Sequence, residues 1–476
     1  MDRNLLGSYA LMCAAEDRLT LSAGDQSAWL FTTLCRLYPD AVAERSDAPS
    51  TAFATARTLG LRLAGGAQMD GAPREAEEYC RRLRAAAAYD FGPLSAESIR
   101  GMYGEKLFLS ASRIDRHAAC RFHFFLYDGL KARERKAASF DAPIYGTFVH
   151  DVLEKTVRRV MAEGGFHQTE KSRVREIAKT HMDEFLSNMV DPALLSSGRF
   201  SYLMNRNYDE VLRVVDVLCD ELRDSAFAPA DCELQFGYGG ALPPVQVTTP
   251  EGQAVVAGAV DRVDVAEIGG QTYYRVVDYK TGRKKFDFTD LLERRGLQML
   301  IYLFALEQSG TERYGGPLRP AGVLYVPAHD DMQRFPDRPE DDAKIDGERR
   351  KSHRRQGLLL NDEAVLQAME PCGASQPELL PYKQGKNGPT GNLMDGGQLR
   401  HLRSYVGSAL RSVTEEIRSG NVRPNPYTQG DTGACTWCPY ASVCHLDLCS
   451  SEPRVLRATG AEEFWTRLAE KEAQNG

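Results

Sequence analysis

The feature that most constrains the fold is a pair of Val- and Tyr-rich segments between residues 255 and 280, joined by two glycines. Gly269-Gly270 is a favoured two-residue turn, because a tight hairpin needs positive φ at its central residues, so the pattern predicts a β-hairpin. Residues equidistant from the turn face each other, which pairs Asp261 with Asp278 and places their Cβ atoms about 4.5–5.5 Å apart. Lys280 lies two residues beyond Asp278 and therefore points to the same face.

Two carboxylates held this close repel each other unless a cation lies between them. Oxygen ligands suit hard divalent ions, so the pair predicts a Mg²⁺ or Mn²⁺ site. The alternative is an ordinary surface hairpin with scattered charges, since an Asp…Asp-x-Lys pattern often arises by chance. An irregular turn or a bulge would also break the facing geometry.

Length and charge limit the other possibilities. The chain of 476 residues is long enough for two or three domains. No apolar run approaches the roughly 18–20 residues that span a bilayer, and the amino terminus lacks a secretory pattern, so we expect a cytoplasmic protein without a membrane partner. A net charge of −7 argues against coating nucleic acid by charge alone, although basic clusters at 283–285 and 349–355 allow a local groove.

Cysteines indicate a second metal-binding group. The sequence has 11 of them, and in a cytoplasmic chain they are expected to be thiols or metal ligands instead of disulfides. Cys435, Cys438 and Cys444 stand close together, a spacing typical of a soft-metal site.

The fourth ligand of this group stays open at the level of spacing. His445 or Cys449 would complete a zinc site close in the sequence. Cys120, from far upstream, would complete the four cysteines that an iron–sulfur cluster needs. Spacing alone does not decide between zinc and a cluster.

Apolar periodicity predicts the main helices. Val149, Leu153 and Val157 share one face of a helix, and an apolar helix from 298 to 306 places Gln298 and Tyr302 four residues apart on one side. Other helices are expected at 74–90, just before Cys120, through 170–225, at 396–419 and from about 455, with strands at 233–236 and 323–327.

The order of these residues carries a resemblance to a known family. The motifs are His150, Asp261, Asp278-Tyr279-Lys280 and Gln298-x3-Tyr302, and they resemble those of the RecB-type branch of the PD-(D/E)xK nucleases. Cys120 precedes them and Cys435, Cys438 and Cys444 follow, as in the iron–sulfur nuclease domains of the AddB family, the second subunits of bacterial AddAB helicase–nucleases. Residues 109–122 and 354–360 are also similar to stretches of that family.

This resemblance implies an α/β fold with a restriction-endonuclease-like core, in which a small mixed sheet is flanked by helices and stapled by an iron–sulfur cluster. It implies a remnant of a helicase-like domain at 1–100, a nuclease domain at 101–450 and a helical tail at 451–476. The polar stretch 328–400, punctuated by Gly and Pro, would be a partly ordered insertion in the nuclease domain. We therefore expect the chain to be the C-terminal part of a longer protein.

The resemblance also implies hydrolysis of DNA phosphodiesters. Asp261, Asp278, the carbonyl of Tyr279 and His150 would hold one or two Mg²⁺ (or Mn²⁺) ions. Glu233 is a weaker candidate, as a metal ligand or as a neighbour of the ligands.

The remaining motif residues receive supporting roles. Lys280 would orient the attacking water and neutralise charge that develops on the phosphate, and Gln298 and Tyr302 would position the lysine or the DNA backbone. A [4Fe–4S] cluster would be held by four thiolates, those of Cys120, Cys435, Cys438 and Cys444.

The function implied is a DNA exonuclease module that acts on the 5′-ended strand within a helicase–nuclease complex processing double-strand breaks, with an AddA-like helicase–nuclease chain as partner. One alternative is a stand-alone 5′→3′ single-strand exonuclease similar to the CRISPR-adaptation nucleases. Another is a cluster-bearing DNA-binding scaffold without catalysis.

Overall fold

The computed structural model describes most of the chain after residue 91 and only isolated positions before it. The described ranges are 92–133, 142–189, 198–282, 284–329, 350–373, 375–444, 446 and 453–475. Residues 91–476 form one compact unit and residues 1–90 another. The helicase-like region expected at 1–100 therefore lies mostly outside the described residues. Of the helix expected at 74–90, only Glu78, Arg81 and Arg82 are described, and all three are helical. No helix among the described residues is long and apolar enough to cross a membrane.

A six-stranded mixed sheet forms the centre of the larger unit, in the order β11-β8-β7-β6-β5-β2. The strands are β2 (Ala228–Phe236), β5 (Gly258–Ile268), β6 (Gln271–Lys280), β7 (Leu318–Pro327), β8 (Gln356–Leu360) and β11 (Leu393–Met394). The β6–β7 and β8–β11 pairs are parallel and the others antiparallel. Strands β8 and β11, which come from the stretch expected to be an insertion, thus extend the sheet itself.

The predicted hairpin is present as β5 and β6. Gly269 and Gly270 have φ of 60° and 76°, as a two-residue turn of this type requires. The strands pair from Ile268–Gln271 to Arg262–Val277, which is the expected register.

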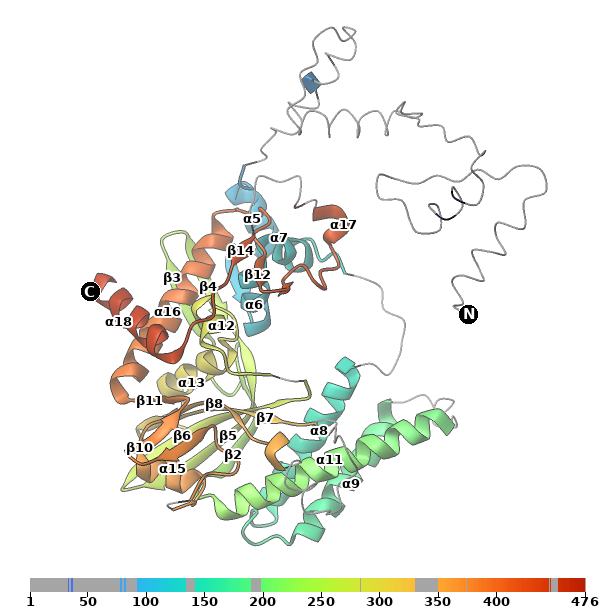
Figure 1. Cartoon of the computed structure of the whole chain (residues 1–476), viewed down its shortest axis with the longest axis vertical. Coiled ribbons are helices and arrows are strands. Elements are labelled where there is room, and N and C mark those ends of the chain that lie inside the picture. The colour runs from blue at the N-terminus through green and yellow to red at the C-terminus, as the bar shows by residue number, and fades with distance from the viewer. Residues whose placement is uncertain are drawn as a thin grey trace, which may run out of the picture. The chain divides into compact units, whose positions relative to one another are not determined.

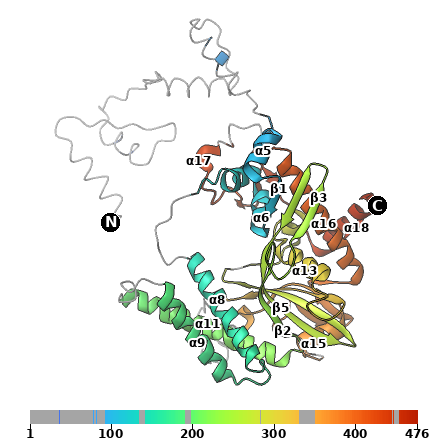
Figure 2. The ribbon, with the colours of Figure 1, turned by 180° about the vertical axis from the view of Figure 1, so that it is seen from behind.

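Three long helices cover one face of the sheet (Figures 1 and 2). They are α8 (Ala142–Ala162), α9 (Lys171–Met189) and α11 (Gly198–Asp224), and α15 (Glu363–Met369) joins them. Val149, Leu153 and Val157 are fully buried in this layer, so the predicted apolar face of α8 is confirmed.

The opposite face packs against α13 and α16, which share a second core with the amino- and carboxyl-terminal elements (Figure 1). These elements are α5 (Ala96–Tyr103), α6 (Ala111–Ala119), α12 (Phe288–Leu292), α13 (Gln298–Ser309), α16 (Gly396–Arg418) and α18 (Ala461–Asn475). A three-stranded sheet lies beside them, built from β1 (Lys106–Leu109), β4 (Gly252–Val256) and β3 (Val245–Thr249). The expected mixed sheet flanked by helices is therefore confirmed.

Short elements complete the described chain. Next to α6 come α7 (Arg121–Phe124) and a π-helix (Phe125–Gly129), and the carboxyl-terminal region adds β12 (Tyr427–Gln429), β13 (Thr432–Gly433), α17 (Ala441–Cys444) and β14 (Arg454–Val455). A small hairpin, β9 (Tyr382–Gly385) and β10 (Gly388–Gly391), lies between β8 and β11 in the sequence.

A group of buried charges joins the sheet to α11. Arg262 donates to both carboxylate oxygens of Asp264, at 2.7 and 2.9 Å, and Arg275 donates to Asp264 as well. Glu221 on α11 accepts from Arg275 and from Arg355, which precedes β8. All five side chains are nearly inaccessible to solvent, so three guanidinium groups share two carboxylates inside the protein.

Candidate active site

The two aspartates of the hairpin lie where β5 and β6 separate. The last ladder pair is Arg262–Val277, and one step beyond it the Asp261 carboxylate accepts a hydrogen bond from the backbone N–H of Tyr279 at 2.8 Å. From there β6 continues along β7, with Asp278 beside Tyr325. Because side chains alternate along a strand, Asp278 shares the face of the sheet that packs toward α13.

Asp278 and Lys280 form a close ion pair on this face. The Lys280 Nζ lies 2.5 Å from Asp278 Oδ2, and the Asp278 side chain is 2% exposed. Burial, and then the charge of Asp261, raise the pKa of Asp278 to about 6 against the opposing effect of Lys280. Lys280 is the partner of Asp278 Oδ2 among the described residues. A buried carboxylate that lies beside a second carboxylate is suited to ligating a cation.

His150 reaches the site from α8. Its Nδ1 lies 3.2 Å from Asp261 Oδ2, and its ring meets that of Tyr279 edge to face. Burial lowers the pKa of His150, but the hydrogen bond to Asp261 and the charges of Asp261 and Asp278 outweigh burial and raise it overall. The structure thus places His150 beside the central aspartate, and its role as a metal ligand stays a prediction.

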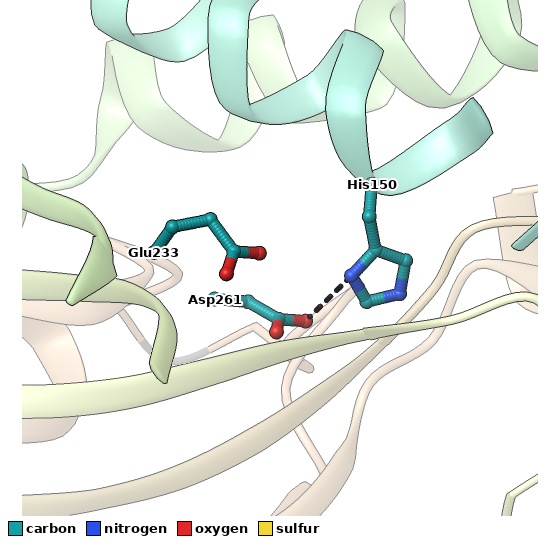
Figure 3. Close-up of side chains that lie close together, drawn as sticks. All are labelled: His150, Glu233 and Asp261. Atoms are coloured by element: carbon teal, nitrogen blue, oxygen red, sulfur yellow. Dashed lines mark ion pairs between the residues drawn. The ribbon is translucent and has the colours of Figure 1, made fainter. Parts of the chain in front are cut away.

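Glu233 joins this group more closely than the sequence indicated. One ligand atom each from His150, Glu233 and Asp261 lie within 4.8 Å of one another, and Figure 3 shows the three side chains converging. Asp278 is not part of that set of three, although its charge raises the pKa of His150. Burial, and then the charges of Asp261 and Glu154, raise the pKa of Glu233.

A local reversal of β2 explains why Glu233 points here. Its φ is +45°, a left-handed conformation that is uncommon for a residue other than glycine. On either side of it, Cys232 packs with the α8–α11 layer whereas Leu234 packs with the α13 layer. Side chains two residues apart on a regular strand share one face of the sheet. Cys232 and Leu234 instead face opposite sides, which the sequence pattern would not predict.

Gln298 and Tyr302 lie together at the start of α13. The Gln298 amide donates to the Tyr302 hydroxyl at 3.2 Å. Burial raises the pKa of Tyr302 to about 12, and the charges of Asp278, Asp261 and Glu233 also raise it. The tyrosine is therefore a neutral hydroxyl beside the acidic group, and its role in positioning stays a prediction.

The cysteines predicted to form one group come partly together. Burial, followed by the charges of Cys120 and Cys438, raises the pKa of the Cys435 thiol, so these three lie near one another. Cys444 ends α17, a few residues further along the chain. Among the described residues, no three sulfurs lie within 4.8 Å of one another, whereas thiolates around one zinc ion would be about 3.8 Å apart. His445 and Cys449, the other ligands considered for zinc, lie outside the described residues.

The backbone around Cys120 is already tied to the carboxyl-terminal segment. Arg454 donates to the carbonyls of Ala118 and Ala119, and its own N–H binds the carbonyl of Pro426 at 2.8 Å. The N–H that follows Cys120 donates to the Asn425 side chain at 2.7 Å. Segments about 300 residues apart in the sequence thus meet beside the cysteines.

Comparisons with known proteins agree on the nuclease region. Residues 108–445 match the family model described as the PD-(D/E)XK nuclease superfamily. Curated relatives named as B subunits of the ATP-dependent helicase/deoxyribonuclease include those of Acetivibrio thermocellus, 32% identical over 83% of this chain, and Clostridium novyi, 31% identical over 79%. The relative of the same name from Thermoanaerobacter sp. is 30% identical over 80% of the chain. These alignments cover 34–35% of the relatives, so the chain spans about a third of their length.

Proposed function

Since the chain belongs to the PD-(D/E)XK nuclease superfamily and is a homologue of helicase/deoxyribonuclease B subunits, we propose that it is the metal-dependent DNA exonuclease module of a helicase–nuclease complex. The observation that carries the proposal is the meeting of His150, Asp261, Asp278 and Lys280 where β5 and β6 separate. Three potential oxygen or nitrogen ligands and one cation on a shared face suit phosphodiester hydrolysis.

The ligands proposed for Mg²⁺ or Mn²⁺ are Asp261, Asp278, His150 and the Tyr279 carbonyl. A divalent ion at such a site polarises the scissile phosphate and lowers the pKa of a bound water. The burial of Asp278 beside Asp261, and the effect of the Asp261 charge on the pKa of Asp278, support this ligand set.

Lys280 would stabilise the transition state. The Asp278 carboxylate holds its ammonium group, which also lies 5.8 Å from the centre of the Tyr325 ring. A fixed positive charge beside the phosphate stabilises the negative charge that builds up as water attacks phosphorus and the ester oxygen leaves. The Gln298–Tyr302 hydrogen bond keeps the neighbouring hydroxyl in place for the DNA backbone.

The cysteine group is proposed to hold a [4Fe–4S] cluster with a structural role. Its ligands would be Cys120, Cys435, Cys438 and Cys444. The hydrogen bonds between the two flanking segments support the role of a staple.

The larger biological role rests on the relatives. We place the module in a complex with an AddA-like helicase–nuclease partner, where it degrades the 5′-ended strand during the processing of double-strand breaks. Purification of the chain together with such a partner, followed by digestion of DNA labelled at one 5′ or one 3′ end, tests the partner and the polarity separately.

The central test is digestion of linear DNA with and without Mg²⁺. Asp278→Asn keeps the size of the buried side chain and removes its charge, and it should slow cleavage by at least about 100-fold. Asp220→Asn is the matched control, because Asp220 pairs with Lys171 on the surface. Digestion that persists in chelator, or an Asp278→Asn protein as fast as the control, would contradict the proposal.

A further inference from the structure

The central sheet carries a row of residues that runs from the candidate active site to β8. Asp278 on β6 pairs with Tyr325 on β7, and Tyr325 pairs with Gln356 at the start of β8. Paired residues of neighbouring strands point to the same face of a sheet, so these three side chains share one face. Neighbouring strands are about 4.8 Å apart, which places Gln356 roughly 10 Å from Asp278 along the row.

A hollow of about 510 Å³ opens beside Gln356. Its polar side chains include those of Arg354, Lys383, Thr390 and Asn392, and no acidic residue of the described chain lines it. Lys383 lies on β9, Thr390 lies on β10, and Asn392 directly follows that hairpin. The stretch expected to be an insertion therefore builds a basic hollow at the end of the row.

The protein leaves several donors in the basic hollow unused. One nitrogen of Arg354 donates to the carbonyl of Tyr382 at 2.6 Å, which fixes the guanidinium group in the wall. Among the described residues, the Lys383 ammonium group and the side-chain amides of Gln356 and Asn392 make no hydrogen bond or ion pair. These donors are available to a ligand that carries acceptors.

The buried charge group adds positive charge next to the basic hollow. Arg355, which also lines the hollow, donates to Glu221 and to the carbonyl of His353, so two of its nitrogens are already engaged. The group has three guanidinium groups and two carboxylates, which leaves one positive charge in excess. Charges inside a protein are screened less than charges in water, so this excess favours an anion in the hollow.

A further lysine continues the positive charge toward the active site. The Nζ atom of Lys284 lies 6.0 Å from the centre of the Tyr325 ring, and that of Lys280 lies 5.8 Å from the same centre. Among the described residues, the Lys284 ammonium group makes no hydrogen bond or ion pair. Tyr325 is the middle residue of the row, so cations stand beside the row from Asp278 to the hollow.

We propose that the basic hollow binds a backbone phosphate of the DNA strand that is cut at Asp278 and Lys280. A phosphodiester carries negative charge and acceptor oxygens but no donor, which matches a wall of donors without acidic residues. Successive nucleotides of a strand rise about 3.4 Å, so a site roughly 10 Å away holds a phosphate a few nucleotides from the scissile bond. This inference rests on the proposed function, and it adds a substrate subsite to that function.

Binding of fluorescently labelled oligothymidylate to the full chain, measured by anisotropy in chelator, reports affinity without cleavage. Lys383→Ala should weaken binding about tenfold, because it removes a charged donor from the phosphate. Lys383→Arg keeps the charge and should bind nearly as tightly as wild type. Lys386→Ala is the matched control, since Lys386 is exposed in the turn of the same hairpin and does not line the hollow. Equal affinities of Lys383→Ala and Lys386→Ala overturn the inference.

The salt dependence of binding tests whether the bound group is a phosphate. Lys383→Ala should make the slope of log affinity against log salt shallower by about 0.7, because one phosphate contact to a single strand is lost. The loss of affinity should be the same for oligothymidylate and oligoadenylate, since phosphate contacts carry no base information. An unchanged slope, or a loss with one base alone, contradicts a phosphate site.

Digestion of DNA separates failure of this inference from failure of the proposed function. A wild type that cuts DNA only with Mg²⁺, together with variants that all bind DNA equally, overturns the subsite alone. A wild type that does not cut DNA, but whose affinity falls on Lys383→Ala, contradicts the proposed nuclease and supports the phosphate site.

Discussion

Replacing Glu221 by Gln should destabilise the protein strongly, because this carboxylate compensates two buried guanidinium groups. It accepts from Arg275 at 3.0 Å and from Arg355, and burial is complete around all three. The group is already short of acceptors, since one nitrogen each of Arg275 and Arg355 lacks a hydrogen bond among the described residues. The substitution keeps the volume and leaves three positive charges with the single carboxylate of Asp264.

Two independent arguments give a similar magnitude. Removing one partner from a buried charge group costs about 3–5 kcal/mol, because the remaining charge is left uncompensated. The pKa of Glu221 falls to about 2 from its usual 4.5, since the nearby arginines outweigh the effect of burial. A carboxyl shifted by this amount contributes about 3 kcal/mol to folding at neutral pH. Because the folded pKa is the lower one, the contribution is complete above pH 4.5 and is lost as the pH falls toward 2.

Urea unfolding followed by circular dichroism measures the effect. Glu163→Gln is the matched control: its pKa also falls to about 2, through hydrogen bonds from Arg173 and Arg159, but those pairs lie on the surface. It should unfold close to wild type, since exposed pairs are screened by solvent. The difference between wild type and Glu221→Gln should shrink below pH 4.5. A loss under about 1 kcal/mol at neutral pH, or equal losses in both variants, would refute the reasoning.

Three further perturbations follow from packing and from the cysteine site. Gly258→Ala should slow DNA cleavage by up to about 100-fold and keep its dependence on Mg²⁺. A Cβ at this position would lie 2.8 Å from the Tyr302 hydroxyl and would displace that hydroxyl. An unchanged cleavage rate would show that no such displacement occurs. Cys120→Ser should lower bound iron and visible absorbance of the purified protein, whereas Cys219→Ser, in the core of α11, should not; equal iron in both would rule out Cys120 as a ligand. Arg454→Met leaves every thiol in place but removes the hydrogen bonds to the carbonyls of Ala118 and Ala119, just before Cys120. The protein should therefore lose its bound iron faster than wild type after dilution. Iron loss at the wild-type rate would show that the thiolates hold the proposed cluster without these hydrogen bonds.

Local rules were enough to predict the hairpin and the helix that carries His150. A Gly-Gly turn fixes register because both of its residues need positive φ, and the register then places every later residue of the two strands. The apolar face of α8 follows from a period of 3.6 residues that a long buried helix keeps throughout. These two elements carry His150 and Asp261, but only the family resemblance implied that the helix would bring the histidine to the aspartate.

Other parts of the fold and of the candidate site could not be predicted from the sequence. They depend on contacts between residues far apart in the chain, or on a departure from regular strand geometry. The left-handed backbone at Glu233 leaves no signal in the sequence, which is why the sequence makes Glu233 only a weaker candidate for the site. Strand β8 pairs with β7, although a long polar stretch separates the two strands in the sequence. The composition of that stretch indicated an insertion, whereas the central sheet continues through β8. The charges at Glu221 and Arg275 look like ordinary surface residues in the sequence, since nothing local shows that their partners are buried with them.

Cys120 is synthesised long before the segments that lie beside it in the folded chain. Cys435 follows it by 315 residues, and Arg454, which binds the backbone just before it, by 334. At about 5–20 residues per second, a ribosome needs roughly 15–60 s between the first cysteine and the second. Cys120 is 7% exposed in the folded chain. Throughout that interval, the segment that covers it has not yet been synthesised. The proposed cluster could therefore assemble only late in synthesis. A chain released before residue 425 would lack Asn425, Arg454 and the three carboxyl-terminal cysteines proposed as its ligands.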